Sequence, residues 1–145
     1  MRKHALLLAL VLLLLLPAWA PRPGVLVGPG WQVVIVSQPK GCWDCVTPRA
    51  GEATLFRQAQ GQTALLAHSY LSGALWYDLQ VGDTLFVDWR EYTIIEVFSW
   101  FPPGEPGRRE ADIYWYVYSR PGSLTLQTCL GTGYWFVIAE QRAGP

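Results

Sequence analysis

The sequence predicts an all-β domain of antiparallel strands, built as a sandwich or as a closed barrel. Three observations support this fold class. The 145-residue chain contains about eight short apolar or alternating segments separated by turn-forming residues. It is rich in aromatic residues, with eight Trp and seven Tyr, which favour strands. It shows no strong amphipathic helix pattern. Closing such a sheet removes its exposed edges.

The first twenty residues are typical of a targeting segment. A positively charged start precedes the apolar run 5–16, and residues 18–20 have a small-x-small cleavage pattern. As a helix the apolar run would rise only about 18 Å, short of the roughly 30 Å hydrocarbon core. Pro21 disfavours cleavage after residue 20. Residues 1–20 are therefore expected to be a signal peptide or an uncleaved anchor, and the protein to be exported, either secreted or membrane-anchored.

The remaining chain is predicted to contain a linker and one domain. Residues 21–30 are rich in proline and glycine, which predicts a linker, and residues 31–142 are long enough for one core. Without the two basic residues of the targeting segment, nine basic groups face eleven acidic ones. This charge near −2, with no basic stripe, argues against a nucleic-acid partner.

The first half of the domain contains four expected strands. Residues 31–37 are apolar and β-branched, 53–56 form a weaker candidate, 63–68 form a stronger one, and 84–89 alternate well. Between the last two, residues 70–79 are expected to hold at most one helical turn.

The second half contains four more. A two-residue turn at Arg90 and Glu91 leads into the strand expected over 92–100, which forms a hairpin with the strand before it. Residues 102–109 (PPGEPGRR) are a loop by composition. Residues 112–119, dense in aromatics, are expected to be a strand. Two further segments complete the set, at 123–128 and 134–141.

Three cysteines remain in an oxidising compartment. Cys42 and Cys45 form a C-x-x-C within a Pro/Gly-rich loop, which favours a structural disulfide over a redox motif between a strand and a helix. Their pairing leaves Cys129 as an intermolecular bridge or a reactive thiol. A zinc site of Cys42, Cys45, Cys129 and His68 is a minor alternative; otherwise no metal or cofactor is expected.

His68 is the only histidine outside the targeting segment, so thiol catalysis that uses histidine must pair His68 with Cys129. Both residues fall at the C-terminal end of an expected strand, where a reactive group is held rigidly yet remains accessible. The alternative is a buried structural cysteine and a surface histidine that never meet.

The local sequences around both residues match known motifs. Residues 125–129 read TLQTC and residues 64–69 read ALLAHS. They resemble the T-L-x-T-C nucleophile segment and the histidine segment of the sortase family. Three more segments are similar to other sortase blocks in the same order: 79–87 (LQVGDTLFV), 92–97 (YTIIEV) and 136–140 (FVIAE).

The resemblance implies a closed eight-stranded β-barrel with little helix and a cysteine transpeptidase of the thiol-protease type, without a cofactor. Cys129 would attack the carbonyl of a C-terminal sorting motif in a surface protein or pilin. His68 would act as general acid and then as general base, while an amine on the cell wall or on another subunit accepts the acyl group. The backbone of Thr128 would lie near the oxyanion.

One position departs from the family pattern. Sortases place an arginine where this chain has Tyr134, and losing one oxyanion donor typically costs ~10²–10³ in rate. Arg120 and Arg142 are the candidates to replace it, with Arg108 and Arg109 in the loop 102–109 as further ones.

The missing arginine also supports an alternative function. The chain would then be a catalytically degenerate sortase-fold module that binds or builds surface structure. Under this hypothesis an aromatic surface would bind the partner. Its expected members are Tyr114, Trp115, Tyr116 and Trp135.

Overall fold

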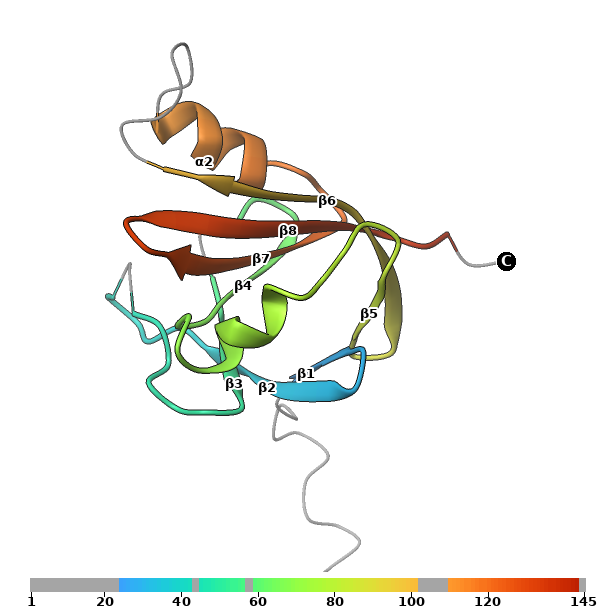
Figure 1. Cartoon of the computed structure of the whole chain (residues 1–145), viewed down its shortest axis with the longest axis horizontal. Helices are drawn as coiled ribbons and strands as arrows, with labels where there is room; N and C mark the ends of the chain where they lie inside the picture. The colour runs from blue at the N-terminus through green and yellow to red at the C-terminus, as the bar shows by residue number, and fades with distance from the viewer. Residues whose placement is uncertain (1–23, 43–44, 57–58, 102–109, 144–145) are drawn as a thin grey trace, which may run out of the picture.

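The computed structural model describes residues 24–42, 45–56, 59–101 and 110–143, which form a closed eight-stranded β-barrel (Figure 1). Around the barrel the strands lie in the order β1-β2-β3-β4-β7-β8-β6-β5. The expected closed barrel is confirmed. Its elements are β1 (Gly24–Gly28), β2 (Trp31–Ser37), β3 (Glu52–Leu55), β4 (Thr63–Leu66), the 3-10 helix η1 (Ser72–Trp76), β5 (Thr84–Val87), β6 (Arg90–Trp100), α2 (Glu110–Tyr118), β7 (Ser123–Leu130) and β8 (Gly133–Gln141).

The barrel is mixed rather than antiparallel throughout. Six neighbouring pairs are antiparallel, whereas β2–β3 and β4–β7 are parallel. The expectation of an antiparallel set is wrong for these two pairs, because a long connection returns the chain to the starting end before the second strand begins. Since β4 and β7 run in the same direction, their C-terminal ends lie at the same end of the barrel.

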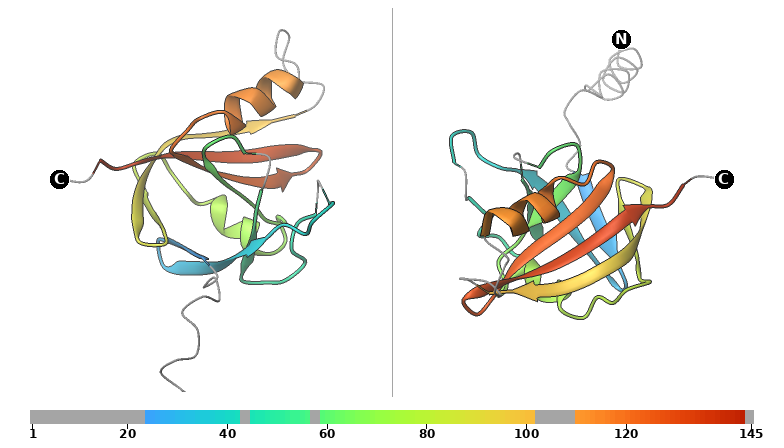
Figure 2. Two further views of the ribbon diagram at one scale, coloured as in Figure 1. Left: turned by 180° about the vertical axis from the view of Figure 1, so that it is seen from behind. Right: turned by 90° about the horizontal axis from the view of Figure 1, so that it is seen from above.

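The segment 112–119 is a helix, α2, and the expectation of a strand there is wrong. Ile113 and Val117, one helical turn apart, are buried, whereas Trp115 is 67% exposed. Residues 113–118 are all apolar or aromatic, so their periodicity does not separate a buried strand from a buried helix. Packing on the barrel decides the outcome, and α2 lies across the outer side of the strands (Figure 2).

Strand β1 lies inside the segment 21–30 that was expected to be a linker. It pairs with both β2 and β5 and thereby closes the barrel, and its Leu26 is fully buried. Residues 24–28 therefore belong to the barrel and not to a linker. Gly28, one of the glycines that suggested a linker, has a packing role, because a Cβ on it would lie 2.2 Å from the ring of Trp31.

The β5–β6 hairpin turns at Asp88 and Trp89, and not at Arg90 and Glu91 as expected. Both turn residues have positive φ, 48° and 71°, as a two-residue hairpin turn requires. The Asp88 carboxylate accepts a hydrogen bond from the Val25 amide at 3.0 Å, which fixes the turn against β1. Arg90 and Glu91 belong to β6 and pair with β5.

Two apolar clusters hold β7 from opposite sides. The first fills the barrel, and the second lies between the outer side of the barrel and α2. Strand β7 is therefore packed on both faces over most of its length. Fully buried members of the first cluster include Leu26, Leu65, Trp76, Leu85, Leu124 and Leu126; the second comprises Ala64, Trp100, Ile113, Val117, Tyr118 and Phe136.

The targeting segment expected over residues 1–20 lies outside the described residues, so it stays a prediction. Among the residues that are described, no helix has the length and apolar character needed to span a membrane.

Candidate active site

The parallel pairing of β4 with β7 brings the two motif segments together. Leu66 pairs with Gln127, and the Ala67 amide donates to the Gln127 carbonyl at 3.2 Å. His68 lies two residues beyond Leu66, and Cys129 lies two residues beyond Gln127 in the same direction. Both residues line one cavity of about 290 Å³.

Alternate residues of β7 point to opposite sides of the barrel wall. Thr125, Gln127 and Cys129, here termed the outer row, lie on the side covered by α2. Thr125 is fully buried and Gln127 is 8% exposed, whereas Cys129 is exposed and is a free thiol. The outer row therefore leads from the helix contact to an accessible sulfur.

The backbone around His68 is fixed by the loop that follows it. The His68 carbonyl accepts hydrogen bonds from the amides of Leu71 at 3.0 Å and Gly73 at 3.1 Å. A Cβ on Gly73 would lie 2.2 Å from the Thr128 hydroxyl oxygen, so only glycine allows this approach. The Thr128 hydroxyl itself donates to the Ala67 carbonyl at 2.8 Å. Thr128 thus ties the histidine strand to the cysteine strand.

Two tyrosines contact the site without having been predicted. The ring of Tyr70 stacks on the His68 imidazole, with centroids 5.1 Å apart and planes inclined by 20°. The Tyr77 hydroxyl donates to the Cys129 carbonyl. Their contacts depend on the path of the chain between β4 and β5, which local sequence does not reveal. The only available signal is Gly73 within the expected helical turn, because an isolated glycine often marks a close approach.

Tyr134 pairs directly with Cys129 across β7 and β8 and lines the same cavity. Its ring lies parallel to that of Trp100, with centroids 6.1 Å apart. A neutral phenol therefore stands beside the thiol, at the position where the resemblance leads one to expect an arginine.

The two candidate replacement arginines lie elsewhere. Arg120 precedes β7, where its guanidinium lies 3.9 Å from the Glu96 carboxylate and 4.5 Å above the ring of Tyr116. Arg142 follows β8 and forms an ion pair with Glu91 at 2.9 Å. Both arginines line a separate cavity of about 670 Å³.

That second cavity is at the opposite end of β7 from the thiol. It includes Ser123, and the six residue steps from Ser123 to Cys129 span about 20 Å of extended strand. Arg120 and Arg142 are therefore not brought to Cys129, whereas Thr128 and Tyr134 are. Among the described residues that line the Cys129 cavity, none is Arg, Lys, Asp or Glu. The segment 102–109, expected to be a loop with Arg108 and Arg109, lies outside the described residues.

Three tyrosines give the cavity its electrostatic character. Burial raises the pKa of the Tyr118 hydroxyl well above its ordinary value, and the nearby Tyr114 and Tyr134 raise it further. The Tyr118 hydroxyl therefore stays protonated and is a hydrogen-bond donor at every physiological pH.

The aromatic residues named for a binding surface do not form one surface. Tyr114 lines the Cys129 cavity, and Trp115 is exposed on α2. The Tyr116 hydroxyl donates to the Glu96 carboxylate at 2.6 Å. The Trp135 indole nitrogen donates to the Trp76 carbonyl at 3.1 Å, beside the inner cluster. Because Tyr114, Trp115 and Tyr116 are consecutive residues of a helix, their side chains point in different directions.

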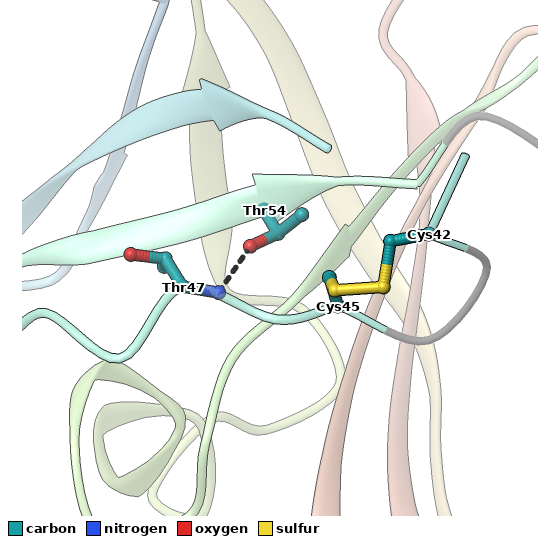
Figure 3. Close-up of a disulfide and its surroundings, with 4 residues drawn as sticks. All are labelled: Cys42, Cys45, Thr47 and Thr54. Carbon is teal, nitrogen blue, oxygen red and sulfur yellow. Dashed lines mark hydrogen bonds between the residues drawn. A yellow bond between two sulfur atoms is a disulfide. The ribbon is translucent and has the colours of Figure 1, made fainter. Parts of the chain in front are cut away.

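A disulfide joins Cys42 and Cys45 in the connection between β2 and β3 (Figure 3). The chain just after it is anchored on β3, because the Thr47 amide donates to the Thr54 hydroxyl at 2.7 Å. Val46, which lies between Cys45 and Thr47, lines the Cys129 cavity. The loop thus contributes one wall of the site, and its position between two strands is not that of a thioredoxin-type motif.

The disulfide also removes the zinc alternative. Both sulfurs are bonded to each other, so the Cys₃His set considered from the sequence is not formed. Within the described ranges, no group of three or more His, Cys, Asp or Glu residues is arranged to hold a metal ion.

Scans of the sequence against family models and curated proteins find no match. Solved structures do match. The sortase A of Actinomyces oris superposes with a TM-score of 0.63 at 18% identity, over 87% of this chain and 82% of that chain. A pilus-related sortase C of Group B Streptococcus gives 0.60 at 15% identity, over 86% and 69%. Sortase E from Streptomyces avermitilis gives 0.55 at 20% identity, over 84% and 89%. The chain therefore has the sortase fold, in agreement with the motifs that its sequence resembles.

Proposed function

We propose that this protein is an exported sortase-type cysteine transpeptidase with Cys129 as its nucleophile. One observation supports this most strongly. The only free thiol among the described residues is exposed in a cavity that it shares with His68, at the ends of two parallel neighbouring strands. A nucleophile and an acid–base group on rigid neighbouring strands are the minimum for thiol acyl transfer.

In the first half-reaction Cys129 attacks as its thiolate, beside a protonated His68, at the carbonyl carbon of a peptide bond in the sorting motif of a surface protein or pilin. The bond to the leaving amine breaks, His68 donates the proton that this amine takes up, and a thioester on Cys129 remains.

In the second half-reaction an amine, on the cell wall or on another subunit, attacks the thioester carbonyl. His68 accepts the proton of the incoming amine, a new amide bond forms, and the sulfur of Cys129 is released. If residues 1–20 stay uncleaved, they would hold the enzyme at the membrane on the outer side, where both substrates lie.

Stabilisation of the oxyanion falls to neutral donors in this chain. The Tyr134 hydroxyl is the side-chain candidate, since Tyr134 pairs with Cys129, and the backbone at Thr128 is the main-chain candidate. The Thr128 hydroxyl is excluded from this role because it already donates to the Ala67 carbonyl. We expect slower acylation than an arginine would give, because a charged donor stabilises an oxyanion more strongly than a neutral one.

The test is a panel of fluorogenic peptides offered to the full chain, to Cys129→Ala and to His68→Ala. The proposal expects cleavage of some peptides by the unchanged protein, with a thioester on Cys129 detected by intact mass. Equal rates for the unchanged protein and Cys129→Ala would reject it.

A second function is favoured by one specific observation, the phenol of Tyr134 in the arginine position without an arginine lining the described cavity. Under this alternative the chain is a catalytically degenerate sortase-fold module that binds surface proteins. Peptide binding without any thioester on Cys129 would identify it.

A further inference from the structure

Two buried polar atoms in the wall of the Cys129 cavity have no hydrogen-bond partner among the described residues. They are the Tyr118 hydroxyl and the side-chain oxygen of Gln127. The two residues are only 5% and 8% exposed. Since an unpaired buried polar group lowers the stability of a fold, such groups call for an explanation.

The packing contacts of these two side chains are apolar or aromatic. Gln127 is flanked on the neighbouring strands by Leu66 and Phe136. The ring of Tyr118 packs against Phe56, with centroids 4.9 Å apart, and against Tyr114 at 5.6 Å. Gln127 and Tyr118 are thus packed among apolar and aromatic groups, and the polar groups near them line the cavity.

The next residue of the outer row shows the opposite arrangement. The Thr125 hydroxyl donates to the Val117 carbonyl at 3.2 Å and accepts from the Gln62 amide at 3.0 Å. Thr125, which α2 covers, has a hydrogen-bonded side chain. Gln127, where the cavity opens, has an unpaired side-chain oxygen. The unpaired atoms are therefore a feature of the cavity.

We propose that Gln127 and Tyr118 form a specificity site for an uncharged polar side chain of the substrate, with a primary carboxamide, as in Asn or Gln, as the group that fits best. The amide oxygen of Gln127 can only accept a hydrogen bond, and the protonated Tyr118 hydroxyl has a hydrogen to donate. The matching group must accept from one and donate to the other, as a carboxamide does. A carboxylate has no proton to donate, and an aliphatic side chain would leave both atoms unpaired.

Size and position agree with this assignment. The cavity of about 290 Å³ holds the volume of about ten water molecules, enough for a side chain and part of its backbone. Gln127 precedes Cys129 by two residues on the same face, so the bound side chain would belong to a residue close to the scissile bond.

This inference rests on the proposed peptide substrate but is tested by binding alone. The full chain carrying Cys129→Ala is immobilised and offered acetylated pentapeptides in which each position in turn is Gln, Asn, Met, Leu, Glu or Asp. We expect that at one position the carboxamide peptides bind about 10- to 100-fold more tightly than their aliphatic and acidic counterparts.

Two glutamine variants in the same background make the test specific. Gln127→Leu should reduce the preference to under about 3-fold and leave the Tm unchanged or raised, because it removes an unpaired buried atom. Gln62→Leu is the matched control, since the Gln62 side chain is bonded to Val117, Thr125 and Arg120. It should lower the Tm and preserve the preference.

The inference is overturned if no peptide binds, if carboxamides are not preferred, or if Gln127→Leu keeps the preference or lowers the Tm as Gln62→Leu does. Its failure is distinguishable from failure of the proposed function. A carboxamide preference without any thioester on the unchanged protein would reject the transpeptidase and keep the specificity site; a thioester without the preference would do the reverse.

Discussion

The side chains on the two faces of strand β7 differ in their burial and in their hydrogen bonding. On the inner face, Leu124 and Leu126 are fully buried and the Thr128 hydroxyl is bonded. On the outer face, Gln127 has an unpaired oxygen and Cys129 is an exposed thiol. Because successive side chains alternate, one face can fix the strand while the other remains available for chemistry. The comparison predicts that stability and reactivity separate between the two faces.

Leu126→Ala should have the largest effect, and on stability. It removes a fully buried side chain from the inner cluster and leaves a cavity, which costs about 2–5 kcal/mol of unfolding free energy. Urea unfolding measures this value. The matched control is Cys129→Ala, three residues further along, which should change the unfolding free energy by less than about 0.5 kcal/mol because the thiol is exposed. Similar losses of unfolding free energy in both variants would contradict the separation of stability and reactivity between the two faces.

Tyr134→Arg tests the face of β7 that carries the thiol. It places a charged donor opposite Cys129, and the acylation rate should rise by about 10²-fold, the usual contribution of one oxyanion donor. Single-turnover thioester formation measures the rate. Tyr134→Phe keeps the ring and removes the hydroxyl, so it should slow acylation. A rate unaffected by either change would show that position 134 does not contact the oxyanion.

Removing the disulfide should have a smaller effect. The double change Cys42→Ser and Cys45→Ser opens a four-residue loop, which costs about 2 kcal/mol or less in the loop-entropy estimate. Because Val46 lines the cavity, we expect KM for the peptide to rise while kcat changes little. A complete loss of turnover in a protein that still folds would instead favour a redox role for this pair.

Arg120→Ala and Arg142→Ala should have the smallest effects. Both side chains lie at the far end of β7 and β8, in partly exposed ion pairs worth about 0–1 kcal/mol each. Peptide cleavage should keep kcat/KM within about 2-fold of the unchanged protein. A loss above 10-fold in either variant would contradict the placement of these arginines away from the thiol.

The features predicted correctly from the sequence are those that depend on local pattern. The β-branched run 31–37 identifies β2, and the two motif segments identify β4 and β7, which do become neighbours in the barrel. Each motif residue lies at a strand end, so the pairing of two strands is enough to bring His68 and Cys129 to one cavity.

The features predicted wrongly depend on the packing of distant segments. Arg120 was a candidate to replace the arginine at the site, but the eight-residue strand β7 places it at the other end from Cys129. The aromatic run 113–118 has no periodicity that distinguishes strand from helix, and β1 has glycine at both ends. The side-chain oxygen of Gln127 is unpaired because the three described elements around it supply no hydrogen-bond donor. No local sequence pattern reveals this.

The most direct test of the central claim is the rate at which a thiol-directed electrophile labels the folded full chain, followed by mass spectrometry for the unchanged protein and for His68→Ala. We expect one label per chain, on Cys129, and a labelling rate at least about 10-fold lower without the imidazole, since an acid–base partner typically contributes 10²–10⁴. Equal labelling rates in the two proteins, or no label on Cys129, would contradict it.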